Sequence, residues 1–475
     1  MIRVEIEPAR LLRFLMTRRW FGAKEREPTH ADVIDAIPVG TAGWIARVEV
    51  QLRDGVERYQ VMLGHGPGAK GQGDDLAEGL EDPLFRTALG EVVAGGGALE
   101  GAESRWVVDW IGSPPDELPT PRLAGVEQSN TSLIFGDAAI MKLYRRLETG
   151  EHPDAEIARF LTTRAQFPHT PELLATARFE SSGGTEVAGM LQRFLPGSRN
   201  ARAVALERGR EAFRLDGGSR VPFAAEAETL GDVTRAMHVA LSSDARDPSF
   251  APEPATREDI ARWADATCRA SDNAMALLER SRVRQSLPPA IRSDAEYVLR
   301  RRDAVRDMVD GWLRELGDDL GARIRHHGDY HLEQVLQAAD GTFMVIDFEG
   351  EPSRSLDERR AKHSALRDVA GMLRSFGYLA ASGTDEARAE LGDANAVRRG
   401  EQWERELREA FLRGYLPDGR DHPGFLPRSR ARLEVLLELF ETEKLFYELS
   451  YELNNRPSWV WIPLRGIVTM LRAAS

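Results

Sequence analysis

The sequence is poor in lysine, in cysteine and in long apolar runs. One cysteine, Cys268, cannot form an internal disulfide, and no apolar stretch approaches the roughly 18 residues that a membrane helix needs. The net charge is −13 and no block of positive charge occurs, so we expect neither a nucleic-acid partner nor an acidic membrane surface. The amino terminus carries early acids and lacks an unbroken apolar core, which is not typical of a secretory signal. We therefore expect a cytoplasmic protein.

Lysine is the rarest of the charged residues. Of 63 basic side chains only five are lysine: Lys24, Lys70, Lys142, Lys362 and Lys444. A coding bias toward arginine explains the total. The two bases are not interchangeable where a compact ammonium must sit beside a phosphate or a carboxylate, so each remaining lysine is a candidate for a specific role.

The 475 residues suggest two to four domains. An amphipathic segment near Pro8 to Trp20 comes first. Residues 44–53 and 57–63 then alternate between apolar and polar around Asp54-Gly55, which predicts a β-hairpin. Four prolines within residues 112–121 indicate a linker after a first domain of residues 1–110.

A second strand pair follows this linker, at residues 132–137 and 138–146, and precedes a helical pattern from Pro153 to Arg164. Beyond about residue 196 long helical patterns dominate, interrupted by a short apolar strand at residues 342–347. We find no internal repeat. The sequence therefore predicts an α+β protein with a large helical carboxy-terminal part.

Residues 326–352, HHGDYHLEQVLQAADGTFMVIDFEGEP, carry the strongest chemical pattern. Asp329 is followed five residues later by Gln334, and Asp347 ends the predicted strand. Protein kinases show the same acid-to-amide spacing in H-R-D-x-x-x-x-N and the same return on a strand in D-F-G. Phosphoryl transfer from ATP needs a carboxylate base and oxygen ligands for Mg²⁺. We predict Asp329 as the catalytic base and Gln334 and Asp347 as the magnesium ligands.

Two alternatives to a kinase site stay open for this segment. Asp329 and Asp347 could cap a helix and end a strand by chance. Alternatively His327 and His331, four residues apart, could bind zinc from one helix face, although the Glu of H-E-x-x-H is missing and Gly328-Asp329 favours a turn.

A kinase also needs a base on the phosphates and an acid that holds this base. Lys142 lies in the apolar strand AIMKLY, as the lysine of V-A-I-K does, and Glu156 in the following helix is the predicted partner. Without the downstream pattern Lys142 is typical of a solubilising residue on an edge strand.

The turn before this strand contains Ser129, Asn130 and Thr131 in place of a glycine-rich loop, and we predict that it binds phosphate. A formal G-x-G-x-x-G at residues 66–71, with Lys70, lacks the strand and helix that such a loop requires, and we interpret it as a loop tip. We expect adenine near Gln192 and Phe194.

The segment of residues 441–461 predicts the binding site for a sugar. At helical spacing Lys444, Tyr447, Glu448 and Tyr451 share a face. Carboxylates bind hydroxyl groups, and aromatic rings cover the apolar side of a sugar. Arg456, Trp459, His331 and Glu349 complete the predicted substrate-binding set. An ordinary amphipathic helix with Phe446, Leu449 and Leu453 inward is the alternative.

Together these motifs resemble the bacterial maltokinases, within the aminoglycoside-phosphotransferase and protein-kinase-like group. The resemblance rests on residues 20–26, 127–147, 327–336, 347–352, 362–376 and 447–459. It implies a bilobal kinase fold with an N-terminal α/β cap subdomain (1–110), an intermediate subdomain that completes the N-lobe (111–195) and a helical C-lobe (196–475). It further implies ATP- and magnesium-dependent phosphorylation of maltose at the anomeric oxygen, to maltose 1-phosphate for glycogen synthesis, and a functional association with trehalose synthase.

The sequence departs from this family at Glu333, where the family has glycine, so that an additional acid adjoins a predicted magnesium ligand. Glucosamine kinases share the core motifs, and the alternative function is therefore phosphorylation of glucosamine or of an aminoglycoside. A pseudokinase that regulates a partner such as trehalose synthase is a third hypothesis.

Overall fold

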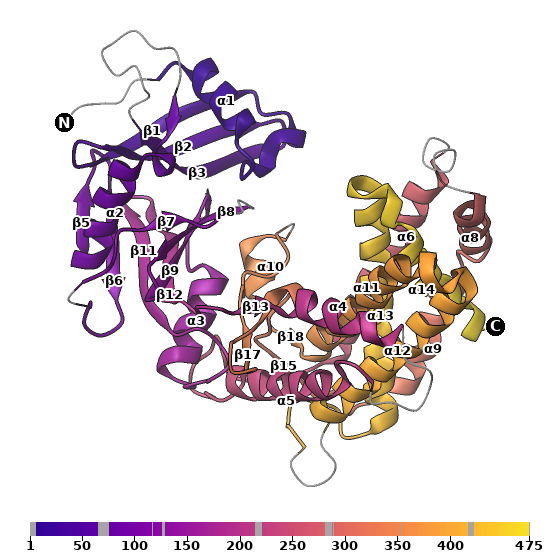
Figure 1. Cartoon of the computed structure of the whole chain (residues 1–475). Coiled ribbons are helices and arrows are strands. Elements are labelled where there is room, and N and C mark those ends of the chain that lie inside the picture. Colours follow the sequence, from indigo (N-terminus) through magenta and orange to yellow (C-terminus); the bar gives the residue numbers. More distant parts are fainter. Residues whose placement is uncertain are drawn as a thin grey trace. The chain divides into compact units, whose positions relative to one another are not determined.

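A computed structural model describes residues 6–64, 76–115, 117–125, 129–213, 221–280, 287, 289–352, 354–416 and 422–474 (Figure 1). The chain divides into two compact units, Met1–Gly197 and Ser198–Ser475. The first unit is rich in strands and the second in helices, which confirms the predicted mixture of both element types.

An antiparallel sheet of strands β1 (His30–Val39), β2 (Gly43–Leu52), β3 (Gly55–Gly64) and β10 (Arg146–Leu147) begins the first unit, and β4 (Ala77–Glu78) pairs with β3. Leu52 pairs with Gly55 across the turn, which confirms the predicted hairpin. Helix α1 (Pro8–Thr17) buries Leu11 and Leu15 with Trp20 and Phe21 in a common core with this sheet. The amphipathic pattern near the amino terminus therefore covers a sheet.

The second sheet of this unit has the strand order β5-β6-β11-β12-β9-β8-β7. Its strands are β5 (Gly97–Glu100), β6 (Ser104–Trp110), β7 (Arg122–Leu123), β8 (Asn130–Phe135), β9 (Ala139–Tyr144), β11 (Leu173–Ser181) and β12 (Gly184–Arg193). Phe135 pairs with Ala139, which confirms the second predicted strand pair. Strands from both sides of residue 110 share this sheet, and the predicted border between cap and intermediate subdomain stays a prediction.

Two helices accompany these sheets. Helix α2 (Pro83–Gly95) contributes Phe85, Leu89 and Val93 to a core that includes residues of both sheets. Helix α3 (Pro153–Thr163), which the sequence predicts, lies against β11 and β12. The short 3₁₀ helices η1 (Gly22–Arg26) and η2 (Gly79–Glu81) complete the described elements of this unit.

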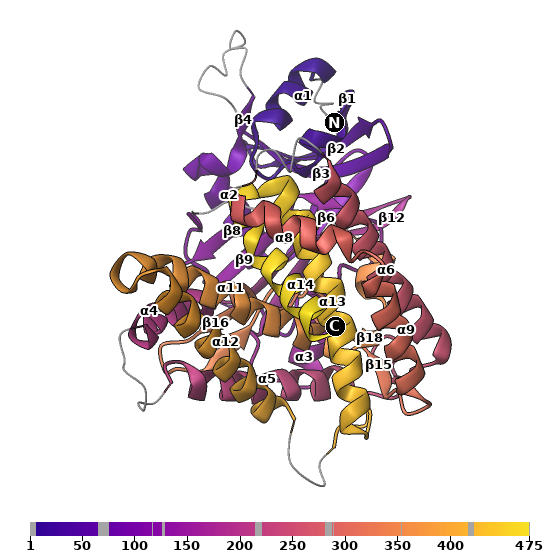
Figure 2. The same ribbon diagram turned by 90° about the vertical axis from the view of Figure 1, so that its right-hand side faces the viewer.

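The second unit is built around helix α13 (Arg430–Asn455), which packs against α6 (Arg257–Glu279), α9 (Ala304–Leu316), α11 (Leu366–Leu391) and α14 (Trp461–Ala473) (Figure 2). The long apolar faces of these helices explain the arrangement, because α13 buries residues on nearly every side. The other described helices are α4 (Ala201–Ala212), α5 (Ala224–Leu241), α8 (Pro289–Arg300), α10 (Leu356–Arg360), α12 (Asp393–Tyr415), η3 (Leu332–Gln334) and η4 (Pro457–Trp459).

Two small sheets hold the segment with the chemical pattern. One contains β13 (Arg199–Asn200), β16 (Val335–Gln337) and β17 (Phe343–Val345), the other β14 (Glu253–Pro254), β15 (Ala322–Ile324) and β18 (His363–Ser364). Strand β17 confirms the short strand that the sequence predicts within the helical part. Within the described residues no helix has both the length and the hydropathy to cross a bilayer.

Candidate active site

A buried carboxylate, that of Asp368, holds the backbone of the loop that carries Asp329. Asp368, in the first turn of α11, accepts hydrogen bonds from the backbone N–H groups of His327 (2.8 Å) and Gly328 (2.9 Å). Its Oδ2 also lies 2.9 Å from Nε2 of His238. Burial opposes ionisation of Asp368, yet His238 and the neighbouring histidines hold its pKa well below the ordinary value. The carboxylate therefore stays charged and fixes the loop directly before Asp329.

The two predicted magnesium ligands lie at one end of the β16–β17 hairpin. Val335 pairs with Val345, and the N–H of Ile346 donates to the carbonyl of Gln334 at 3.0 Å. Asp347 directly follows Ile346, so Gln334 and Asp347 are close neighbours at this end of the hairpin. Asp347 has a positive φ of 70°, which is unusual for a residue with a side chain. Strained backbone of this kind is concentrated at functional sites. Both side chains offer the oxygen donors that Mg²⁺ prefers.

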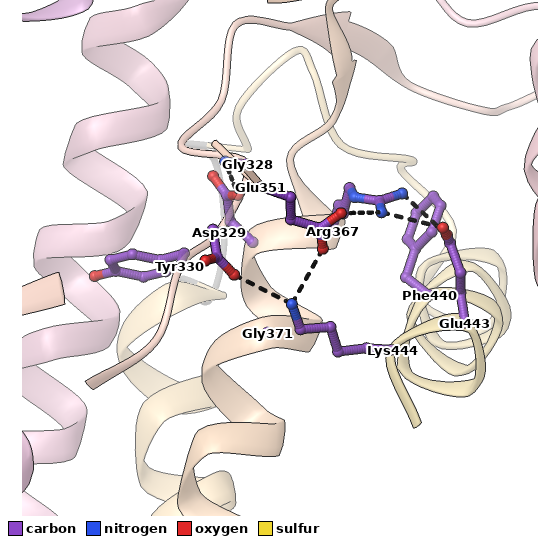
Figure 3. Close-up of a pocket in the computed structure, with 10 residues that line it drawn as sticks. Gly328, Asp329, Tyr330, Glu351, Arg367, Gly371, Phe440, Glu443 and Lys444 are labelled. Atoms are coloured by element: carbon purple, nitrogen blue, oxygen red, sulfur yellow. Dashed lines mark hydrogen bonds and ion pairs between the residues drawn. The ribbon is translucent and has the colours of Figure 1, made fainter. Parts of the chain in front are cut away.

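Lys444 connects Asp329 to a second acid, Glu351 (Figure 3). Its Nζ lies 3.2 Å from Asp329 Oδ1 and 3.2 Å from Glu351 Oε1. Burial alone would raise the pKa of both carboxyl groups. The Lys444 ammonium outweighs burial, with help from His331 at Asp329, so the pKa of Asp329 falls well below its ordinary value. The pKa of Glu351 falls to about 2. Asp329 is therefore ionised at neutral pH.

Further ion pairs of alternating charge adjoin Glu351. Arg354 Nε donates to Glu351 Oε2 at 2.7 Å. Arg367 forms a bidentate ion pair with Glu443, with both N···O distances 3.0 Å. Arg354 also lies 3.5 Å from Glu443 and Arg367 lies 3.8 Å from Glu351, so the ion pairs connect α11 and α13 to the loop after β17. They keep Lys444 in place beside the predicted base.

A pocket of about 400 Å³ opens beside Asp329. Its lining includes most of the predicted substrate-binding set: His331, Lys444, Tyr447, Glu448, Tyr451, Arg456 and Trp459. The helical spacing therefore grouped side chains of α13 that do line one pocket, and their contact with a substrate stays a prediction. Glu349 is not among the described lining residues, and its backbone carbonyl accepts a hydrogen bond from Arg359.

The two acids of α13 in this pocket differ in their partners. Glu452 is saturated, because Arg456 donates to both of its oxygens and the Tyr378 hydroxyl donates to Oε1. Glu448 accepts two hydrogen bonds from Arg374, at 3.0 and 2.9 Å, on Oε2 alone. Within the described residues Glu448 Oε1 accepts no hydrogen bond. Of the two α13 acids in this pocket, Glu448 is the one with an oxygen open to a ligand.

Aromatic rings border the same pocket. The Lys444 ammonium lies 4.7 Å from the centre of the Tyr447 ring, and Tyr378 stacks on Trp459 with centroids 6.1 Å apart. Tyr451 is 43% exposed. Such rings can cover the apolar face of a sugar.

His327 and His331 do not lie on one face of a helix, as the zinc alternative requires. His327 Nε2 lies 2.9 Å from the carbonyl oxygen of Ile346, and its ring packs against Tyr330 and Phe348. His331 precedes η3, where Nδ1 accepts a hydrogen bond from the N–H of Glu333. The additional acid Glu333 is 61% exposed, lies 3.6 Å from Arg202 and lines the pocket beside Asp329.

In the first unit, Lys142 on β9 pairs with a carboxylate of α3. Its Nζ lies 2.9 Å from Asp154 Oδ2, and the Asp154 side chain is 1% exposed. The sequence pattern favours Glu156, two residues further along the same first turn, and that pairing stays a prediction. The lysine strand and the acid-bearing helix do come together as expected.

The three residues of the predicted phosphate turn, at the start of β8, differ in their exposure to solvent. Ser129 is exposed and Asn130 is half-buried, but Thr131 is 1% exposed. The Thr131 hydroxyl accepts a hydrogen bond of 2.8 Å from Nε of the fully buried Arg145. The Thr131 side chain is therefore buried against Arg145, and its contact with a phosphate stays a prediction. Glu127, Gln128 and the loop of residues 66–71 with Lys70 lie outside the described residues.

The residues predicted near adenine have other partners. The Gln192 amide donates to the carbonyl of Pro171 at 3.3 Å, and the N–H of Phe194 donates to the carbonyl of Ala138 at 3.1 Å. Neither group is open to adenine in this arrangement, and their contact with adenine stays a prediction.

The sequence pattern did not reveal several residues that shape the site: Asp154, Glu351, Arg367, Asp368, Arg374 and Tyr378. Two signals were present. Asp154 is a second acid in the first turn of α3, and Asp368 follows an arginine in the segment KHSALRDVAG that supports the family resemblance. Neither signal specifies a contact partner.

No protein-family model matches the chain. A curated glucosamine kinase from Streptacidiphilus jiangxiensis is 26% identical over 351 residues, which cover 73% of this chain and 72% of the relative. A second one, from Mycolicibacterium smegmatis, is 27% identical over 355 residues, covering 73% and 78%.

The solved structures agree with these relatives. A glucosamine kinase in complex with glucosamine, ADP and inorganic phosphate has a TM-score of 0.66 at 21% identity and covers 94% of each chain. Crystal form B of a glucosamine kinase has a TM-score of 0.67 at 22% identity, covering 97% of this chain and 99% of the other. The predicted bilobal kinase-like fold is thereby confirmed. The homologues of this chain are kinases that act on a sugar, and its fold is the one that they share.

Proposed function

We propose that the protein is a small-molecule kinase that transfers a phosphoryl group from ATP to a hydroxyl group of an amino sugar, with glucosamine as the substrate. The observation that carries the proposal is the pocket of about 400 Å³, which is lined both by Asp329 and by Glu448, an acid with one oxygen open to a ligand. A cationic amine is a suitable partner for that oxygen. The curated glucosamine kinases support the same substrate.

In this mechanism Asp329 accepts the proton of the attacking sugar hydroxyl. Its lowered pKa keeps the carboxylate ionised, so it orients the hydroxyl by accepting its hydrogen bond. Lys444 holds the carboxylate in position, and Asp368 holds the backbone of the loop. Positioning of this kind supplies most of the catalysis in phosphoryl transfer.

Gln334 and Asp347 would hold the magnesium ion, because their oxygen atoms form a suitable donor set at the end of the hairpin. When bound, the ion neutralises negative charge on the phosphates. Lys142, held by Asp154, would bind the phosphates in the first unit, with Ser129 and Asn130 in the turn beside it.

Substrate selectivity would lie in Glu448. Arg374 fixes this carboxylate through Oε2 and leaves Oε1 for the substrate amine. Glu452 offers a matched control, because its oxygens already bind Arg456 and Tyr378. Glu448→Gln should raise KM for glucosamine about tenfold or more and leave KM for glucose nearly unchanged. Glu452→Gln should not produce this discrimination.

Phosphorylation of maltose is the second candidate. Three aromatic side chains, Tyr447, Tyr451 and Trp459, line one pocket, and a disaccharide has more apolar surface to cover than a single sugar ring. A functional association with trehalose synthase belongs to this candidate.

A panel of glucosamine, maltose, glucose and an aminoglycoside with ATP, read by phosphorus NMR, tests the proposal. We expect turnover of glucosamine above all others, and a loss of about 10²- to 10⁴-fold in kcat for Asp329→Ala with the fold retained. An acid-labile phosphate formed only from maltose would select the second candidate. Near-wild-type turnover in Asp329→Ala would overturn the assignment of the base.

A further inference from the structure

The helical unit contains a second, larger cavity of about 820 Å³. Side chains of α9, α11, α12, α13 and α14 line it, and none of them lines the pocket beside Asp329. Small residues make the space, including Gly377, Ala381 and Gly466. The volume falls within the range of roughly 300 to 1,000 Å³ that ligand sites of proteins occupy.

Arg374 lies in the wall between the two spaces. Its side chain is 8% exposed, and Nε and Nη2 both donate to Glu448 of the first pocket. The remaining nitrogen, Nη1, faces the second cavity: it lies 3.4 Å and 3.5 Å from the points where side chains on Gly377 and Gly466 would begin. In the part of the chain that the structure describes, Nη1 donates to no protein group.

Glu404 lies beside this free donor. Its Oε1 is 3.1 Å from the same point at Gly377, and its charge acts on both Arg374 and Arg408. Across the described ranges Glu404 has neither a hydrogen bond nor an ion pair. An open donor next to an open acceptor matches the hydroxyl groups of a polyol, each of which both donates and accepts.

The rest of the lining favours an uncharged ligand. Four charged groups of the lining neutralise one another in pairs, since Arg408 forms two bonds of 2.7 and 3.0 Å with Glu441, and Arg465 pairs with Glu401. The lining also holds charges of both signs outside these pairs, on Glu315, Glu438 and Arg405. Two indole rings, Trp312 and Trp461, also line the cavity and can cover the apolar face of a sugar ring.

We propose that this cavity is a second binding site for a neutral saccharide, and that its occupancy weakens binding in the first pocket. Arg374 is attracted by Glu448 and by Glu404. Ligand hydroxyl groups that donate to Glu404 reduce its pull on Arg374. The guanidinium then neutralises Glu448 more completely, and Glu448 attracts a substrate amine less. The coupling rests on the proposed function, whereas the binding does not.

Calorimetric titration of the full chain tests the binding. The protein is first titrated with glucosamine, which reports on the first pocket, and then with maltose as the neutral probe. We expect saturable binding of one maltose to the glucosamine-saturated protein. Glu404→Leu and Trp461→Ala should each weaken it at least tenfold, and Glu409→Leu, on the exposed side of the same helix, should leave it unchanged.

The coupling has its own measurement. Saturating maltose should raise KM for glucosamine about fivefold with kcat unchanged, and this effect should disappear in Glu404→Leu. The proposal is overturned if maltose binds only in the absence of glucosamine, or if Glu404→Leu and Trp461→Ala bind it as the wild type does. A protein that binds maltose in the second cavity but neither binds nor phosphorylates glucosamine would refute the proposed function alone.

Discussion

Replacement of Lys444 by methionine tests whether this lysine sets the ionisation of the predicted base. The Lys444 ammonium lies 3.2 Å from Asp329. At an effective dielectric constant of roughly 20, a pair at this distance is worth about 5 kcal/mol. The two side chains are 20% and 25% exposed, so water screens the pair. We take about half of that value, which corresponds to about two pKa units.

The sign follows from the charges. Burial raises the pKa of Asp329, and the Lys444 charge lowers it. In Lys444→Met the raising effect of burial is no longer opposed by this charge. The pKa of Asp329 should therefore rise by about two units. Because a base must be ionised to accept a proton, the acidic limb of kcat/KM should move to higher pH. Profiles from pH 3 to 8, recorded through ADP release, measure this shift, because the wild-type limb lies below the ordinary carboxyl pKa of 3.8.

The matched control is Lys444→Arg, which keeps the positive charge and should keep the limb near its wild-type position. The amine of glucosamine titrates equally in all variants, so differences between profiles report on the enzyme. A Lys444→Met profile that superimposes on the wild type would refute the reasoning. An equal shift in Lys444→Arg would do the same.

Three further variants test the framework around the site. Arg145→Met removes the buried ion pair with Glu78 and should cost about 3–5 kcal/mol in urea unfolding, whereas adding Glu78→Gln should recover part of this loss. Asp368→Asn should lower kcat about 100-fold with KM nearly unchanged, because the loop before Asp329 loses its charged acceptor; an equal change in KM would contradict this role. Burial lowers the pKa of His326 from 6.5 to about 4, so stability should fall by about 2 kcal/mol between pH 7 and pH 5, as the unfolded chain takes up the proton first. His326→Phe should remove this part of the pH dependence.

Local pattern was sufficient to predict the hairpins, helix α3 and the side chains of α13 that line one pocket. Period-2 and period-3.6 patterns depend only on neighbours in the sequence, which explains this success. The same rule explains why Thr131 is buried. Strand β8 begins at Asn130, so Thr131 is the first inward-facing residue and meets Arg145 instead of solvent.

Long-range contacts could not be predicted in this way. Asp368 supports His327 and Gly328 from about forty residues further along the chain, and only the packing of α11 under the loop brings them together. The contact between Lys142 and Asp154 is similar. Asp154 and Glu156 both lie in the first turn of α3, and the sequence alone does not specify how this turn packs beside β9.

The scarcity of lysine acquires a physical meaning at Lys444. Arginine supplies 58 of the 63 basic residues, and its planar fork suits the two oxygens of one carboxylate, as Arg367 shows with Glu443. Lys444 instead donates from one nitrogen to two different carboxylates, and Lys362 likewise donates to Glu253 and to the carbonyl of Pro248. A guanidinium at position 444 keeps its positive charge beside both acids, but its planar fork should bind one carboxylate and break the hydrogen bond to the other. Lys444→Arg should therefore preserve the pH limb, which depends on the charge, but lower kcat about tenfold, since one carboxylate shifts from its position. A wild-type kcat in this variant would show that the geometry of the ammonium is dispensable and that its charge alone is required.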